Sequence, residues 1–209
     1  MYLSRIPLDI SNRKTQIALV SPNKFHGAIE EAFAVRQGRN LWRIDVWKNE
    51  MYLLILSPAK PDLGYIANQF GVPDHCGETK EYGALLNRIR EGSVWQFRLV
   101  ANPTHSIKME NGRGKVAAHT VEKYQVEWLE NQSVKRGFSI LPDTLRVMGM
   151  NWKIFNKRNI NQKVRLLEVA YEGKLKVVDT ETFKSTLING IGREKAYGMG
   201  LMTIVESRD

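Results

Sequence analysis

The chain has 209 residues, of which 43% are hydrophobic, and its formal net charge at pH 7 is +9. The hydrophobic content is enough for packed cores and argues against wholesale disorder, and the length suits one large domain or two of about 100 residues each. The N-terminal segment lacks the form of a signal peptide, and the longest apolar runs are far too short to span a bilayer. We therefore expect a soluble, cytoplasmic protein with no membrane partner.

The first half reads as strand, helix, two strands, helix and strand, which is the order of the ferredoxin-like unit. Ser21-Pro22 predicts a helix start with Ser21 as N-cap, and Gly38 predicts its end. The polar stretch 77–81 predicts a loop. The strands are expected at 1–8, 41–47, 51–57 and 94–100, with a hairpin turn at Lys48-Asn49-Glu50, and the second helix at 61–70.

The second half has a similar plan. A helix is expected to open at Thr120, and another to be capped by Asp179 or Thr180. Strands are expected at 138–141, 145–155, 164–171 and 199–205. The sequence therefore predicts an α+β fold of two tandem ferredoxin-like (βαββαβ) domains. We place the boundary within 104–119 and divide the chain into domains 1–110 and 111–209.

Positive charge is concentrated between residues 135 and 174, a segment that contains nine Lys and Arg residues but three Asp and Glu residues. Such a concentration is typical of a nucleic-acid footprint. Within it, the basic, amide-rich segment 151–165 predicts a hairpin that contacts phosphates, with an ordinary solvated hairpin as the alternative. Side chains cannot read the deep, narrow major groove of an RNA helix, so the end or loop of a stem is the natural target. The cations expected to bind RNA here are Lys153, Lys157, Arg158, Lys163 and Arg165.

Residues 190–201 form a glycine-rich stretch that contains Arg193 and Lys195. Glycine allows a positive φ and a close approach of the backbone to a ligand. Backbone N–H groups together with cations then suit a phosphate. The stretch lacks the Gly-Lys-[Ser/Thr] ending of a Walker loop, so it is no nucleotide cradle of that kind. We expect it to close the second unit and to position an RNA backbone or the first helix, with Arg193 and Lys195 contacting phosphate.

His26 lies one turn into the first helix, at the edge of its apolar face. A histidine there can act as general acid or base in RNA cleavage, and RNA supplies its own nucleophile in the 2′-OH, so a metal is not obligatory. The alternative is a capping residue or an i,i+4 partner of Glu30. The single cysteine, Cys76, follows His75 with no second spaced pair, so neither a disulfide nor a metal site is expected.

These pieces together resemble one family, CasE, the CRISPR repeat-RNA endonuclease of type I-E systems. The match follows the family's order over nearly the whole chain. The residues that carry it are Met1-Tyr2-Leu3-Ser4, the helix with His26, Leu41-Trp42-Arg43-Ile44, the run Phe97–Pro103, Glu122-Lys123 with Glu127-Trp128-Leu129, Tyr171-Glu172-Gly173 and the glycine-rich stretch.

The resemblance implies tandem ferredoxin-like domains and metal-independent cleavage of precursor CRISPR RNA at the base of a repeat hairpin. It implies a 5′-hydroxyl and a 2′,3′-cyclic phosphate as products, no cofactor, and retention of the product within the Cascade complex beside its other subunits. It implies that the catalytic histidine is His26. The basic hairpin corresponds to the family's groove-reading hairpin by position and charge.

One departure concerns the partner of His26. Some members carry a tyrosine three residues before the histidine and a basic residue further along the helix, where this chain has Asn23 and Glu31. Another group then takes the partner role, or His26 works with positioned RNA and electrostatic help. The nearby cations are Lys24, Arg36 and Arg39. The alternatives are a catalytically silent RNA-binding subunit of the same complex and a metal-dependent nuclease acting on DNA.

Overall fold

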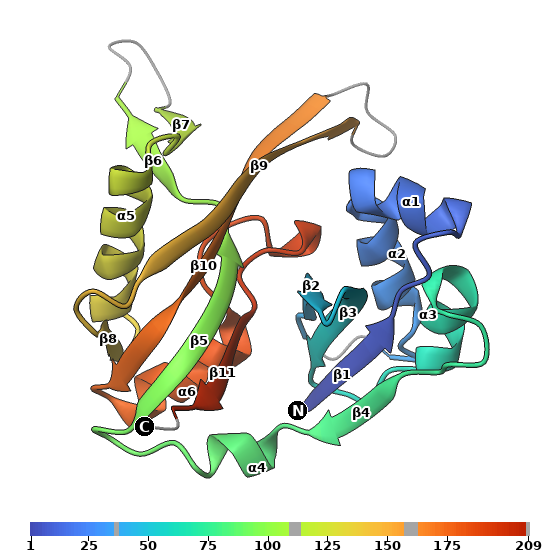
Figure 1. The fold of residues 1–209 in the computed structure, drawn as a ribbon, viewed down its shortest axis with the longest axis horizontal. Helices are drawn as coiled ribbons and strands as arrows, with labels where there is room; N and C mark the ends of the chain where they lie inside the picture. Colours follow the sequence, from blue (N-terminus) through green and yellow to red (C-terminus); the bar gives the residue numbers. More distant parts are fainter. Residues whose placement is uncertain (36–37, 109–113, 157–162, 208–209) are drawn as a thin grey trace.

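The computed structural model describes residues 1–35, 38–108, 114–156 and 163–207. The first half forms an antiparallel sheet in the order β2-β3-β1-β4, and the second half forms one in the order β11-β5-β10-β8, with β9 paired to β10. Figure 1 shows both sheets in the middle of the molecule, with α5 on one flank and α1, α2 and α3 on the other. In the first sheet β1 lies in the middle and pairs with β3, and in the second sheet β5 lies in the middle and pairs with β10. Two such central strands are the arrangement of the ferredoxin-like unit. The predicted fold class is confirmed.

The elements of the first half are β1 (Tyr2–Pro7), α1 (Arg13–Val20), α2 (Asn23–Glu31), β2 (Leu41–Trp47), β3 (Glu50–Ser57), α3 (Leu63–Phe70), β4 (Glu78–Glu81) and α4 (Gly83–Leu86). Those of the second are β5 (Val94–Ala101), β6 (Thr104–Ile107), β7 (Lys115–Ala118), α5 (Glu122–Val134), β8 (Phe138–Ile140), β9 (Arg146–Asn156), β10 (Lys163–Val177), α6 (Thr180–Asn189), the 3₁₀ turn η1 (Lys195–Tyr197) and β11 (Met202–Glu206).

The predicted hairpin between β2 and β3 is confirmed, with Trp47 opposite Glu50. Its two turn residues, Lys48 and Asn49, have φ of 51° and 64°. Two positive φ values in a two-residue loop match the right-handed twist of the flanking strands. The cap of α6 is also as predicted, because the Asp179 side chain accepts from the Thr182 N–H.

Four predictions about the elements are wrong. Gly38 does not end the first predicted helix, because α2 ends at Glu31. The stretch 77–81 is no loop, because Glu78–Glu81 pairs with β1 as the fourth strand of the first sheet. The strand at 94–100 is present but belongs to the second sheet, where it pairs with β10 and β11. Ser21 is no N-cap: it ends a helix that the sequence analysis did not predict, and α2 follows Pro22 without a side-chain cap.

By strand pairing, the chain leaves the first sheet after Glu81 and enters the second at Val94. The domain division at residues 110 and 111 stays a prediction. The segment 104–119 around that position forms a two-stranded hairpin, β6 with β7, in the part of it that the structure describes. The helix expected from Thr120 begins at Glu122, after Val121.

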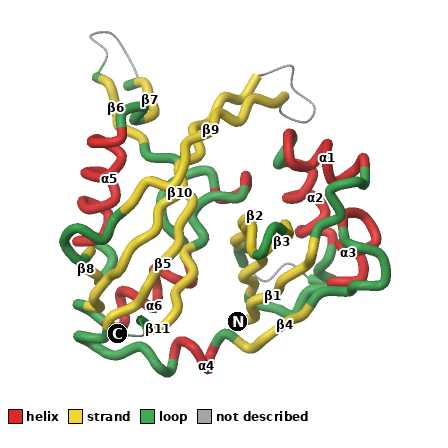
Figure 2. The backbone as a smooth tube through the Cα atoms, viewed as in Figure 1, coloured by secondary structure: helices red, strands yellow, loops and turns green. Residues whose placement is uncertain are grey.

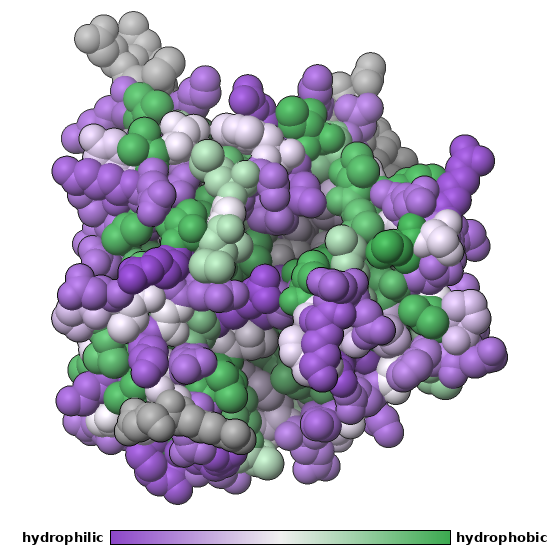
Figure 3. Space-filling view, in the orientation of Figure 1, coloured by the Kyte–Doolittle hydropathy of each residue, from purple (hydrophilic) through white to green (hydrophobic). Residues whose placement is uncertain are grey.

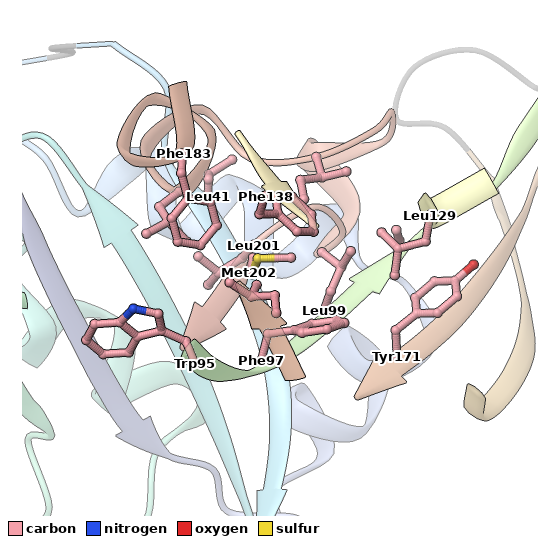
Figure 4. Packing of buried hydrophobic residues seen from close by; sticks show 14 of the residues in the cluster. Leu41, Trp95, Phe97, Leu99, Leu129, Phe138, Tyr171, Phe183, Leu201 and Met202 are labelled. Carbon is pink, nitrogen blue, oxygen red and sulfur yellow. The ribbon is translucent and has the colours of Figure 1, made fainter. Parts of the chain in front are cut away.

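The main core lies between the second sheet and its helices, and residues of the first half enter it. Figure 4 shows Leu41, from β2, beside Phe138 and Phe183 of the second half. A second core packs α2 and α3 against the first sheet around Phe25, whose ring centroid lies 4.9 Å from that of Phe70. Because Leu41 of the first sheet packs inside the core of the second half, the two halves are joined at this edge.

Arg43 joins the two sheets through a buried set of hydrogen bonds. Its side chain is 1% exposed and forms a two-pronged ion pair with Asp45 on the same strand. The guanidinium also donates to the Arg98 carbonyl at 2.9 Å, the Leu201 carbonyl at 2.8 Å and the Thr203 hydroxyl at 2.8 Å. Bonds from a charged donor in a dry site are strong, so this contact fixes how β2 sits against β5 and β11.

Candidate functional site

His26 is placed by the apolar face of α2. Phe25 and Ile29 are fully buried, and the Phe25 ring lies 5.7 Å from that of Trp42. Neighbouring residues on a helix are about 100° apart, so anchoring Phe25 leaves the next side chain at the edge of the buried face. His26 is accordingly half-buried and lines a cavity of about 890 Å³.

The opposite wall of this cavity is the glycine-rich stretch. α2 and η1 are in contact, although they lie near opposite ends of the sequence. The residues that line the cavity are His26, Glu30, Gly38, Arg39, Asn40, Gly192, Arg193, Glu194, Lys195 and Ala196. Four of the residues singled out from the sequence, His26, Arg39, Arg193 and Lys195, therefore share one site.

Gly198 fixes how closely this stretch approaches the first half. Its φ is 84°, and a Cβ there would lie 2.7 Å from Cζ3 of Trp42. Two backbone hydrogen bonds hold the stretch in place. The Ile191 N–H donates to the Gly200 carbonyl at 2.9 Å, and the Gly200 N–H donates to the Val100 carbonyl of β5 at 2.6 Å. Only glycine combines a left-handed backbone with a contact of this kind.

Replacing Gly198 with alanine should destabilise the protein by about 1–3 kcal/mol, since the methyl group clashes with a buried indole and the backbone is strained. Urea unfolding measures the loss. Gly83→Ala is the matched control, because a Cβ at Gly83 meets nothing within 4 Å and the residue lies in α4. The control should keep or slightly raise stability; equal losses in both variants would contradict the packing argument.

Positive charges crowd the glycine-rich side of the cavity. Nζ of Lys195 donates to the Gly192 carbonyl at 2.5 Å. Burial lowers the pKa of Lys195, and the positive charges of Arg39 and Arg136 lower it further. Although Glu30 and Glu194 also line the cavity, its three cations, Arg39, Arg193 and Lys195, suit an anion such as a phosphate diester.

Arg136 was missed as a site residue by the sequence analysis, which counted it only within the basic segment. It lies just after the end of α5, and its guanidinium donates to the Gly190 carbonyl at 3.4 Å. Burial lowers its pKa, and it acts electrostatically on Lys195. No local sequence signal relates it to the glycine-rich stretch, because only the packing of α5 against the loop after α6 brings them together.

The other predicted RNA contacts lie elsewhere. Figure 2 shows β9 and β10 as one long ribbon that reaches toward α1, and Nζ of Lys153 on this ribbon lies 3.4 Å from the Leu19 carbonyl. Arg165 lies 4.1 Å above the Trp152 ring, and Lys163 is exposed at the start of β10. Lys24 lines a different cavity, with Asn23 and Glu31. Arg36, Lys157 and Arg158 lie outside the described residues.

A narrower cleft of about 320 Å³ separates the two halves beneath this ribbon, and it is lined by both Lys153 and Glu168. Figure 3 shows the surface hollowed between the halves, with polar and apolar residues mixed along it. Nζ of Lys153 lies 4.0 Å from Oε2 of Glu168. Burial raises the pKa of Glu168, and Lys153 opposes part of that effect.

This raised pKa gives Glu168 a defined pH dependence. When the pH lies between the ordinary carboxyl pKa of 4.5 and the raised pKa of Glu168, the folded protein binds more protons than the unfolded chain. The contribution of this group to the free energy of unfolding therefore falls as the pH rises through this range. Glu168→Gln should therefore gain stability relative to wild type between about pH 4 and about pH 8. Urea unfolding of both proteins at the two pH values measures the difference between their free energies of unfolding. A difference that is the same at both pH values would contradict the raised pKa of Glu168.

Within the described ranges, no group of three or more His, Cys, Asp and Glu side chains is placed to hold a metal ion. Cys76 is exposed, and the neighbouring His75 lines a separate cavity. No helix in the part of the chain that the structure describes is long and apolar enough to cross a membrane.

Comparisons with known proteins agree along nearly the whole chain. The family model described as CRISPR associated protein matches residues 1–205. The CRISPR-associated endoribonuclease Cse3 of Thermus thermophilus is 26% identical over 218 residues, covering 98% of this chain and 99% of its own. A structure of CRISPR endoribonuclease Cse3 bound to a 19-nucleotide RNA has a TM-score of 0.83 at 23% identity, covering 98% and 100% of the two chains. A chain of a CRISPR RNA-guided surveillance complex has a TM-score of 0.71 at 21% identity, covering 99% and 100%.

Proposed function

We propose that this chain, which belongs to the CRISPR-associated protein family, is an endoribonuclease that binds a CRISPR repeat stem-loop and cleaves precursor CRISPR RNA at the base of the stem. The observation that carries the proposal is the shared cavity, in which His26 faces the cations of the glycine-rich stretch. The similarity to an endoribonuclease named Cse3 supports the reaction class, and the similarity to a chain of a surveillance complex supports retention of the product within Cascade.

The chemistry needs a phosphate held among cations and a group that moves a proton. The 2′-OH of the nucleotide before the scissile bond attacks the phosphorus, and the bond to the 5′ oxygen breaks. A 2′,3′-cyclic phosphate and a 5′-hydroxyl result. His26 would exchange a proton with the reacting oxygens. Arg39, Arg193 and Lys195 would stabilise the charge that develops on the phosphorane.

The long ribbon of β9 and β10 would hold the RNA stem. Lys163 and Arg165 are exposed on β10, and Lys153 faces the cleft beside α1. Contacts of this kind to the RNA backbone position the duplex without reading its sequence. Lys157 and Arg158, at the expected tip, lie outside the described residues, and we keep them as proposed contacts. Lys24, which lines a different cavity, and Arg36, which lies outside the described residues, remain proposed contacts.

Repeat RNA incubated with the protein in excess EDTA tests the proposal. We expect one cut at the base of the stem. Tight binding with intact RNA would support the alternative of a catalytically silent RNA-binding subunit, for which Asn23 in place of the relatives' tyrosine is the specific observation. Cleavage that EDTA abolishes and a divalent ion restores would instead support a metal-dependent nuclease, and DNA added in parallel would show its substrate.

A further inference from the structure

Cleavage by a 2′-OH needs two proton transfers, one from the attacking oxygen and one to the leaving 5′ oxygen. One imidazole in the cavity accounts for one of them. We infer that Lys195 is a second catalytic residue, whose ammonium group protonates the 5′ oxygen while His26 accepts the proton of the 2′-OH. The inference rests on the proposed function and adds to it the partner that Asn23 does not supply.

The side chains around the cavity leave few other donors. Among the described residues that line it, Arg39 and Arg193 carry guanidinium groups, which stay protonated in proteins and make poor proton donors. The carboxyl groups of Glu30 and Glu194 accept hydrogen bonds, as Glu30 does from Nδ2 of Asn40 at 3.0 Å. Lys195 is the one lysine among the described residues that line the cavity. Its ammonium group can donate a proton and remain in place as a neutral amine.

The glycine-rich stretch holds Lys195 at the cavity wall. The residue opens η1, directly after Glu194, whose φ is 62°. A Cβ on Gly200 would lie 3.2 Å from Cγ of Lys195, so the absence of a side chain there makes room for the lysine stem. Its ammonium group rests on the Gly192 carbonyl, a neutral acceptor that a charged phosphate oxygen would readily replace.

The surrounding charges favour the role of acid. Arg39, before β2, and Arg136, after α5, lower the pKa of Lys195 in addition to burial. Arg193, Glu194, Glu30 and His26 are the other charged or titratable groups among the described lining residues. A lysine with a lowered pKa is a stronger acid than an ordinary one, and the closer its pKa lies to the working pH, the more effective the transfer.

The step is balanced in atoms and charge. The 2′ oxygen forms a bond to phosphorus as its proton passes to the imidazole of His26. The bond from phosphorus to the 5′ oxygen breaks as the ammonium group gives that oxygen a proton. Imidazolium and a neutral amine remain, and solvent returns both groups to their starting forms.

A repeat RNA with sulfur in place of the scissile 5′ oxygen provides the test, because a thiolate leaves without protonation far more readily than an alkoxide. Lys195→Ala should cleave the oxygen substrate about 10²–10⁴-fold more slowly at saturating protein. On the sulfur substrate it should recover most of this loss, because only the missing phosphate contact of Lys195 still slows the reaction. Lys195→Arg keeps the positive charge but has no proton acidic enough to donate, so it should stay slow on oxygen and recover on sulfur.

Two controls separate this role from others. His26→Ala should stay slow on both substrates, since it lacks the acceptor for the 2′ proton. Lys184→Ala, on α6 and paired with Glu181, should behave as wild type. Lys195→Arg that cleaves the oxygen substrate at the wild-type rate would reduce Lys195 to a phosphate contact. Sulfur that fails to rescue Lys195→Ala, or that rescues His26→Ala instead, would also overturn the inference. Wild-type protein that leaves both RNAs intact would refute the proposed function itself.

Discussion

His26→Ala is expected to slow cleavage of bound repeat RNA by about 10²–10⁴-fold, the usual contribution of a positioned general acid or base. The affinity for the RNA should stay close to that of wild type, because the cations of the cavity and of the ribbon remain. The helix should also be intact, since Phe25 and Ile29, and not His26, anchor it in the core. Single-turnover cleavage at saturating protein, with a separate binding titration, measures both quantities.

His75→Ala is the matched control for this variant. His75 lines a different cavity, beside the exposed Cys76, and has no place in the proposed chemistry. Cleavage by this variant should match wild type. A His26→Ala variant that cleaves as fast as His75→Ala would show that the reaction takes place elsewhere on the molecule.

Arg43→Met should be the most destabilising single change considered, at about 3–5 kcal/mol. Two backbone carbonyls lose their buried donor, and Asp45 keeps only the longer contact of 3.5 Å with Nε of Arg98. For a chain of this length, the melting temperature should fall on the order of 10 °C. Because the same side chain joins β2 to β5 and β11, the loss should also loosen the cavity between α2 and the glycine-rich stretch.

Arg88→Met tests whether burial is the cause. Arg88 is also ion-paired, with Glu206 on β11, but the two side chains are 58% and 60% exposed. Exposed pairs contribute about 0–1 kcal/mol, so this variant should melt near the wild-type temperature. Similar losses for Arg43→Met and Arg88→Met would contradict the role assigned to the buried contact.

Local patterns were sufficient for the elements whose signal lies in a few adjacent residues. The two turn residues between β2 and β3 and the Asp179 cap of α6 are examples. Strand pairing was not predictable in the same way. The pattern of 94–100 reports that a strand is buried, but not which sheet buries it. β4 is short, polar and largely exposed, so it has no alternating pattern to detect. α1 buries only Thr15 and Ala18, which leaves little helical periodicity to recognise.

The functional site was likewise predictable only where the signal is local. The sequence indicated His26 on the first predicted helix, and it indicated Arg193 and Lys195 together in the glycine-rich stretch, which was expected to position an RNA backbone or that helix. Their shared cavity depends on the contact between α2 and η1, which joins the two halves of the fold and has no local signature. The position of Lys24 was predictable and was missed: two residues apart on a helix are about 200° apart, so Lys24 and His26 face different cavities.

We propose that one cavity, built by α2 and the glycine-rich stretch, holds the scissile phosphate. The most direct measurement is a structure of the complex with repeat RNA that carries a 2′-deoxy nucleotide before the scissile bond, so that the RNA binds but cannot react. We expect the scissile phosphate to lie within hydrogen-bond reach of both the His26 imidazole and the Lys195 ammonium group. A scissile phosphate located in the cleft beside Glu168, or beyond reach of His26, would contradict it.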